Sequence, residues 1–246
     1  MNISLKDLVM AGVQWELADT SIGFMEMVSH KTTTPPRTRT AAVVPPISPA
    51  TPMDVETTKA MASRPTTMDA LNRMILEFNH PLKGGATNVV VPMAASTPNG
   101  LVIITDIPSS DDDASGKILS GAAGELLDKM LAAIGMSREN VSILPLVFWR
   151  TPGGRTPTRI ELDLARPFVL RAIELLEPRV ILTLGTLAAS EIAGTDLMKN
   201  HGTPVVLSND INVFPIYHPN YLILKPGAKA DVWTVLQNVQ KMLKNV

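Results

Sequence analysis

The chain of 246 residues contains no cysteine. This absence excludes disulfide bonds, thiolate zinc sites and cysteine nucleophiles, and it excludes any iron–sulfur cluster held by cysteine. A protein without disulfides fits a reducing compartment, so we expect a cytoplasmic protein. Its site must be built from other side chains.

The sequence also lacks a long apolar run and an excess of positive charge. No apolar stretch approaches the roughly 20 residues that span a bilayer, and the first residues do not resemble a signal peptide, so we expect no membrane association. The net charge is −1 and the pI is about 6.4. A non-specific nucleic-acid binder usually carries a basic excess, so any contact with DNA must come from a local patch.

The first part of the chain divides into two zones. Residues 1–29 carry apolar side chains at helical spacing and predict a short helical segment, which either packs on the rest of the protein or binds a protein partner. The members of this stripe are Leu5, Leu8, Val9, Val13 and Leu17. Residues 30–66 are rich in proline and threonine, which predicts a disordered linker.

The remaining residues, 67–246, predict one monomeric α/β domain. Strands are expected at 88–92, 101–105, 141–149, 180–184 and 213–217. Helices are expected at 68–78, 120–134, 160–176 (interrupted near Pro167), 186–192 and 228–244. This alternation predicts a three-layer α/β/α sandwich with a central, mostly parallel sheet. In such sheets the site lies beyond the carboxyl ends of the strands.

Four segments in chain order carry a resemblance to a known family. Residues 105–127 run from Thr-Asp-Ile-Pro through an acidic stretch to Gly-Glu-Leu-Leu, and residues 149–158 form an Arg- and Gly-containing loop. Residues 178–185 are Pro-Arg-Val-Ile-Leu-Thr-Leu-Gly, and residues 217–222 contain a His-Pro pair. Together they resemble the motifs of iron–sulfur (family-4) uracil-DNA glycosylases. The resemblance implies the glycosylase fold and excision of uracil from DNA.

The resemblance also assigns roles to residues at the strand ends. Asp106 stands where the family has a glutamate, and His218 matches the histidine that stabilises the leaving base, so both are candidate catalytic residues. Arg150 and Arg155 either contact DNA phosphates or keep their loop soluble. Pro219 and Asn220 follow the histidine and are further candidate DNA contacts.

The base pocket that the resemblance implies has lost several of its groups. Thr105 replaces a glycine, where the backbone should approach the base. Leu119 replaces the phenylalanine that stacks on uracil, and it has no aromatic face. Pro145 replaces the asparagine that reads the base edge, and proline has neither a side-chain donor nor a backbone N–H. Ile107 completes these pocket positions.

The four cluster cysteines of the family correspond to Glu77, His80, Trp149 and Ala165. Tryptophan and alanine cannot ligate iron, so we expect no cluster and no other cofactor. His80 and His201 are expected to be polar surface residues, and the acidic run 111–113 a solvated loop.

Two hypotheses for the function remain open. The first is a uracil-DNA glycosylase-like protein of base-excision repair that hydrolyses the N-glycosidic bond of uracil or a damaged base. The second is a non-catalytic DNA- or protein-binding member of the same superfamily. The resemblance favours the first hypothesis, and the substitutions at Thr105, Leu119 and Pro145 favour the second.

Overall fold

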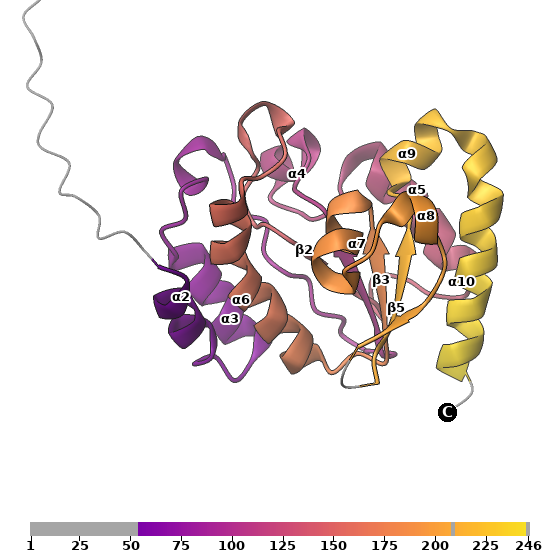
Figure 1. Cartoon of the computed structure of the whole chain (residues 1–246), viewed down its shortest axis with the longest axis horizontal. Coiled ribbons are helices and arrows are strands. Elements are labelled where there is room, and N and C mark those ends of the chain that lie inside the picture. Colours follow the sequence, from indigo (N-terminus) through magenta and orange to yellow (C-terminus); the bar gives the residue numbers. More distant parts are fainter. Residues whose placement is uncertain (1–53, 208–209, 245–246) are drawn as a thin grey trace, which may run out of the picture. The chain divides into compact units, whose positions relative to one another are not determined.

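The computed structural model describes residues 54–207 and 210–244 (Figure 1). The predicted helical segment 1–29 and most of the predicted linker therefore lie outside the described residues. Within the described part, the centre is a five-stranded sheet in the order β2-β1-β3-β5-β4. Its strands are β1 (Leu101–Thr105), β2 (Ser142–Pro145), β3 (Val180–Leu184), β4 (Val205–Val206) and β5 (Asn212–Ile216). All neighbouring pairs are parallel except β4 and β5.

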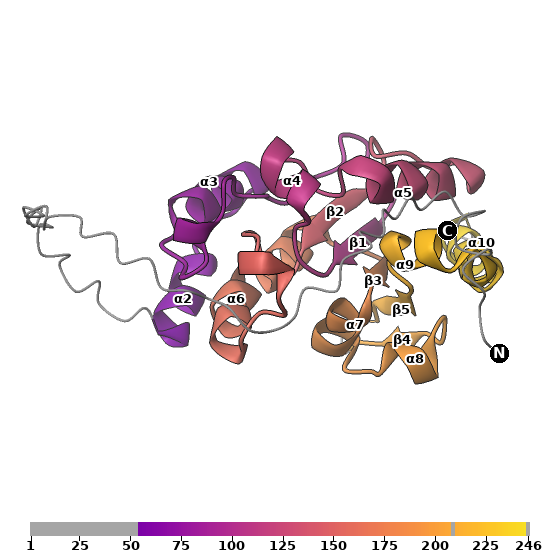
Figure 2. The same ribbon diagram turned by 90° about the horizontal axis from the view of Figure 1, so that it is seen from above.

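Helices cover both faces of this sheet and create two cores (Figure 2). Successive strand residues point to opposite faces, so Val102 and Ile104 belong to one core and Leu101 and Ile103 to the other. The first core includes residues of α2 (Val55–Ala62), α3 (Met68–Glu77), α6 (Arg159–Leu176) and α7 (Thr186–Ala193). The second includes residues of α5 (Gly121–Ala133), α9 (Pro219–Leu224) and α10 (Lys229–Lys244). The predicted three-layer α/β/α architecture is confirmed.

Shorter elements complete the described part. They are the helices α4 (Ser110–Ser115) and α8 (Leu197–Asn200) and the 3₁₀ turns η1 (Lys83–Gly85), η2 (Pro152–Gly154) and η3 (Pro226–Ala228). No helix within the described ranges is long and apolar enough to cross a bilayer.

The end of the predicted linker is folded, which corrects its boundary. Asp54 caps α2 by accepting a hydrogen bond from the Thr57 N–H at 2.6 Å, and Ala62 is buried. Just beyond α2, the Pro65 carbonyl accepts a hydrogen bond from Arg171 of α6 at 2.8 Å. The prediction of a disordered linker is therefore wrong for the part from Asp54 onwards, because packing on α6 stabilises a helix too short to be stable alone.

Three further expectations about elements are corrected. The strand expected over 141–149 ends at Pro145, after which the Leu146 N–H donates to the carbonyls of both Thr105 and Asp106. The expected strand 88–92 is instead an irregular segment with isolated bridges from Val89 to Trp149 and from Met93 to Ile143. Helix α6 is not interrupted at Pro167, because its apolar face on both sides of the proline is buried.

Candidate functional site at the carboxyl ends of the strands

The strand ends bring two residues distant in sequence into contact. Thr105 is the last residue of β1, and His218 follows β5 and caps α9. The Thr105 Oγ1 and the His218 Nε2 lie 3.1 Å apart. Strand β3 lies between β1 and β5 and is followed by Gly185, which has φ of +103°. A Cβ at this glycine would clash with the carboxylate of Asp106, so its missing side chain leaves room for that group.

The hydrogen bonds of His218 determine its tautomer. Its Nδ1 accepts from the Asn220 N–H at 3.1 Å, so this nitrogen carries no proton. Burial of the imidazole lowers the pKa of His218 to about 4, against a smaller opposing attraction from Asp112. At neutral pH the ring is therefore uncharged, and its proton resides on Nε2, from which it is donated to Thr105.

Asp106 is oriented towards the beginning of α7. Its Oδ1 accepts a hydrogen bond from the Ala188 N–H at 2.6 Å, and the helix dipole favours a negative charge there. Burial nevertheless raises the pKa of Asp106 to about 6, although backbone donors from Ala188 and Leu187 oppose this shift. Asp106 is thus predominantly ionised above about pH 6, and its bond to Ala188 ties the β3–α7 turn to the end of β1.

The other residues predicted to line a base pocket contribute apolar surface. Pro145 is the partner of Thr105 in the β1–β2 register and is buried. Leu119 is 2% exposed, has φ of +48°, and packs in the second core. Ile107 is half-buried against the first core. None of these three side chains can form a hydrogen bond with a base.

The acidic run is not a solvated loop, and this expectation is wrong. Helix α4 begins with a capping box in which Ser109 and Asp112 bond reciprocally, and Asp112 also accepts from the Ser120 N–H at 2.6 Å. Asp113 accepts from the backbone N–H groups of Thr87 and Asn88. Both carboxylates are buried, and both accept hydrogen bonds from within the protein. They therefore hold the loop after β1 in place instead of facing solvent. The Ser-x-x-Asp spacing was the sequence signal for this box.

An aromatic cluster includes two of the positions that the resemblance assigns to iron–sulfur ligands, His80 and Trp149. The rings of His80 and Trp149 are stacked at 4.4 Å with an interplanar angle of 7°. Phe78 and Phe168 pack edge to face at 4.8 Å beside them, and Phe78 also contacts Trp149. Ala165 is fully buried in the same core. His80 is 2% exposed, so its prediction as a surface residue is wrong.

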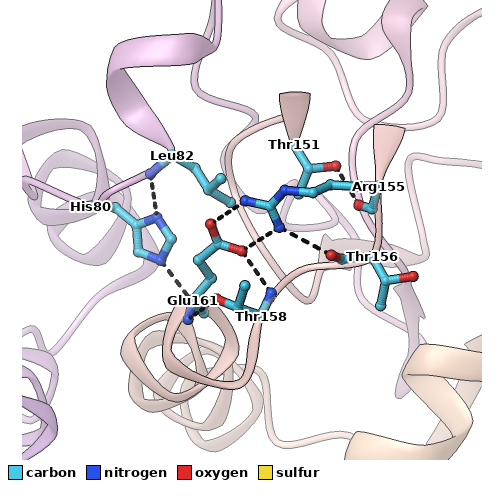
Figure 3. Close-up of polar contacts among 7 residues, drawn as sticks. All are labelled: His80, Leu82, Thr151, Arg155, Thr156, Thr158 and Glu161. Atoms are coloured by element: carbon cyan, nitrogen blue, oxygen red, sulfur yellow. Dashed lines mark hydrogen bonds and ion pairs between the residues drawn. The ribbon is translucent and has the colours of Figure 1, made fainter. Parts of the chain in front are cut away.

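The donor set at these positions does not fit a metal cluster. Glu77 is exposed at the end of α3, and Trp149 and Ala165 offer no ligand. The two ring nitrogens of His80 are already bonded, Nε2 to the Glu161 carbonyl at 3.0 Å and Nδ1 to the Leu82 N–H at 3.2 Å (Figure 3). The described residues also contain no group of three or more His, Cys, Asp or Glu side chains that could hold a metal ion.

Arg155 is held by an ion pair next to this aromatic cluster. Its guanidinium donates to the Glu161 carboxylate in a two-pronged arrangement, at 2.8 and 2.5 Å (Figure 3). The Thr158 N–H also donates to Glu161, which completes a capping box at the start of α6. Hydrogen bonds from Arg155 are the main reason why the pKa of Glu161 is lowered to about 2. Arg155 is thus oriented towards Glu161, and its pairing was not predicted from the sequence.

The remaining candidate DNA contacts are arranged differently. Arg150 is half-buried and forms no ion pair with any described residue. Pro219 is buried at the first position of α9, whereas Asn220 is exposed. His201, expected at the surface, is half-buried and stacks on Tyr217 at 4.0 Å. The structure therefore brings Thr105 and His218 into contact, with Asp106 turned towards α7, and it leaves Arg150 without an ion pair among the described residues.

Comparison with known proteins gives a consistent result. Residues 95–240 match the family model of the uracil DNA glycosylase superfamily. A type-4 uracil-DNA glycosylase of Thermotoga maritima is 34% identical over 146 residues, which cover 58% of this chain and 76% of the relative. Relatives with the same description from Archaeoglobus fulgidus (31% over 150 residues; 57% and 75%) and Saccharolobus solfataricus (32% over 165 residues; 63% and 76%) are also similar. The chain belongs to the uracil DNA glycosylase superfamily.

Proposed function

We propose that this chain is a uracil-DNA glycosylase-like protein of base-excision repair that retains the leaving-group donor but has lost the groups that read and hold uracil. The observation that carries this proposal is His218, an uncharged imidazole with its proton on Nε2 at the carboxyl ends of the strands. The names of the relatives, type-4 uracil-DNA glycosylases, support the substrate class.

The proposed chemistry is hydrolysis of the bond between the base and the sugar. The base must first leave the helical stack and enter the site. As the N-glycosidic bond breaks, its electron pair goes to the base; the oxygen of a water molecule bonds to the sugar carbon, and the proton that this water loses ends on the departing base. An N–H donor from His218 would stabilise the negative charge that develops on a base oxygen. Asp106, ionised at neutral pH, keeps the β3–α7 turn in place.

The missing groups make uracil a poor substrate. When a base enters a site that lacks the groups that pair with its edge, the donors and acceptors of the base are left unpaired, which costs binding free energy. Pro145 offers no donor, and Leu119 is buried in the core, where it cannot stack on a base. We therefore expect excision of uracil by the unmodified protein to lie at background.

A second candidate function is binding of DNA or protein without catalysis. The specific observation in its favour is that the His218 donor is already occupied by Thr105. In this case Arg150 would supply the local contact with DNA, and residues 1–29 would bind a protein partner. For both candidates we propose a monomer that acts in the cytoplasm without an iron–sulfur cluster.

A single-turnover assay on a uracil-containing oligonucleotide tests the proposal. The unmodified protein should bind duplex DNA and release no uracil above background. In the protein with Leu119→Phe and Pro145→Asn excision should rise, and His218→Ala should abolish that gain; no gain would favour binding without catalysis. Rapid excision that His218→Ala abolishes would show a working uracil-DNA glycosylase and would contradict the loss of base reading. Failure to bind any DNA would instead favour a protein-binding role.

A further inference from the structure

The feature that carries a further inference is the acceptor of the His218 proton. The donor nitrogen of His218 lies 3.1 Å from the Thr105 hydroxyl, and Thr105 is only 1% exposed. We propose that the hydroxyl of Thr105 sequesters the Nε2–H of His218, so that Thr105 is the residue that keeps this donor from a bound base. This inference rests on the proposed function and adds a cause for inactivity that is separate from Leu119 and Pro145.

The number of available protons makes the sequestration effective. Because the Asn220 N–H donates to Nδ1, the neutral ring has a single N–H, and that N–H is directed to Thr105. One proton cannot form a strong hydrogen bond with Thr105 and with a base oxygen at once. A base would have to displace the hydroxyl, and the displaced oxygen would then need a new partner in a buried place.

The surroundings of Thr105 oppose such a displacement. Its neighbours in the sheet register are Pro145 on β2 and Leu184 on β3, and its carbonyl accepts from the Leu146 N–H. A β-branched side chain in a strand also has few favourable χ1 rotamers. The hydroxyl therefore cannot turn away without exchanging places with its own methyl group in a packed environment.

A series of substitutions separates the hydroxyl from the bulk of the side chain. Thr105→Val removes the hydroxyl and keeps the shape, whereas Thr105→Ser keeps the hydroxyl and removes the methyl group. Thr105→Ala is a second hydroxyl-free variant in case valine disturbs folding. Thr183→Val is the matched control, because Thr183 is a buried threonine of β3 whose hydroxyl has no partner among the described residues.

The first measurement is exchange of the His218 ring proton in the full-length protein by nuclear magnetic resonance, with the signal identified by its loss in His218→Gln. The proton should be protected in the unmodified protein, in Thr105→Ser and in Thr183→Val. In Thr105→Val and Thr105→Ala it should exchange about fivefold faster or more, the factor that corresponds to one net hydrogen bond. Equal protection in all variants would overturn the proposal.

The second measurement is affinity for a duplex that contains 2′-fluoro-2′-deoxyuridine, which resists hydrolysis. Thr105→Val should bind about fivefold more tightly than the unmodified protein, and Thr105→Ser should bind equally. Tighter binding by Thr105→Ser and not by Thr105→Val would show that bulk, not the hydroxyl, obstructs the site. Binding by none of these proteins would count against the proposed function, while proton exchange would still decide whether Thr105 sequesters the donor.

Discussion

The aromatic cluster around Trp149 and the strand-end site are the two regions where this chain departs from the motifs it resembles, and the departures differ in kind. At the aromatic cluster, new contacts occupy the place of the lost ligands: His80 stacks on Trp149 and bonds to the Glu161 carbonyl. At the strand-end site, Leu119 and Pro145 bring no polar group to the positions where the resemblance predicts base-reading groups.

The difference shows what each region requires. A core needs apolar groups of suitable shape and volume, and many combinations of side chains satisfy that need. A base-reading site needs particular donors and acceptors at particular positions, which apolar packing cannot replace. The fold can therefore persist where the donors and acceptors at the strand ends differ.

The largest expected effect is that of emptying the aromatic cluster. Trp149→Ala removes a fully buried ring and should lower the free energy of unfolding by about 3–5 kcal/mol, or the thermal midpoint by roughly 10 °C. Trp233→Ala is the control, because Trp233 is 40% exposed and should have a much smaller effect. Thermal unfolding measures both midpoints. Similar decreases for the two variants would contradict the stabilising role that we assign to the cluster.

The strand-end site should show two opposing dependences on pH. Burial lowers the pKa of His218 to about 4, so its contribution to stability is complete above about pH 6.5 and is lost as the pH falls towards 4. Burial raises the pKa of Asp106 to about 6, so its contribution is complete below about pH 4 and is lost as the pH rises through 6. Each effect amounts to roughly 3 kcal/mol at most.

Removing one of the two groups should reveal how the other makes the free energy of unfolding depend on pH. Between pH 4 and 6.5, Asp106→Asn should become less stable on acidification, and His218→Gln should become more stable. Denaturant unfolding across this range measures both, with Asp111→Asn as a control on an exposed carboxyl of the same segment. Parallel curves for all the proteins would contradict the directions of both pKa shifts.

Restoring the base-reading groups should have a moderate effect on activity. Leu119→Phe with Pro145→Asn should raise single-turnover excision of uracil by about tenfold, and by more than the two single changes combined, because the groups act on the same bound base. The gain is limited because Thr105 still holds the His218 proton and because a larger ring at the buried Leu119 strains the second core. Glu77→Ala, at an exposed cluster position, should leave excision at background.

A smaller effect is expected at the edge of the first core. Deletion of residues 1–53 should change the thermal midpoint by less than about 2 °C, whereas deletion of residues 1–66 should lower it by roughly 5 °C. The second deletion removes α2 and the carbonyl of Pro65 that Arg171 contacts. Equal midpoints for the two truncated proteins would show that α2 does not stabilise the domain.

The smallest effect is expected when iron is withheld: we expect no change in stability. Protein prepared in iron-depleted medium should have the same thermal midpoint as protein from ordinary medium, and neither should absorb light near ~400 nm as a cysteine-ligated cluster does. Stoichiometric iron and sulfide in the ordinary preparation would contradict the assignment of the cluster positions to apolar packing.

The sequence predicted the sheet better than its surroundings. Strands β1 and β3 have the predicted bounds, because continuous apolar runs of five residues leave little choice of structure. Helix α2 was missed because its few buried residues form no clear stripe, and its stability comes from packing on α6. The acidic helix α4 was not predicted, because consecutive aspartates are typical of a solvated loop and only the Ser109–Asp112 capping box indicates a helix start.

The site was predicted in part for a similar reason. The placement of Asp106 and His218 at strand ends follows from the alternation of strands and helices. The contact between Thr105 and His218 joins residues 113 positions apart and depends on side-chain directions that no local pattern encodes. The pairing of Arg155 with Glu161 likewise depends on the curvature of the loop before α6.

The bridge between Met93 and Ile143 has a consequence for self-association. Reciprocal hydrogen bonds of 2.8 Å connect these residues, so the irregular segment after Asn88 covers the outer edge of β2. An uncovered edge strand is a template on which another chain can add and start an aggregate. At the opposite edge, β4 is only two residues long and offers a poor template. Loss of the Met93–Ile143 bridge would therefore open the longer of the two edges to intermolecular strand pairing.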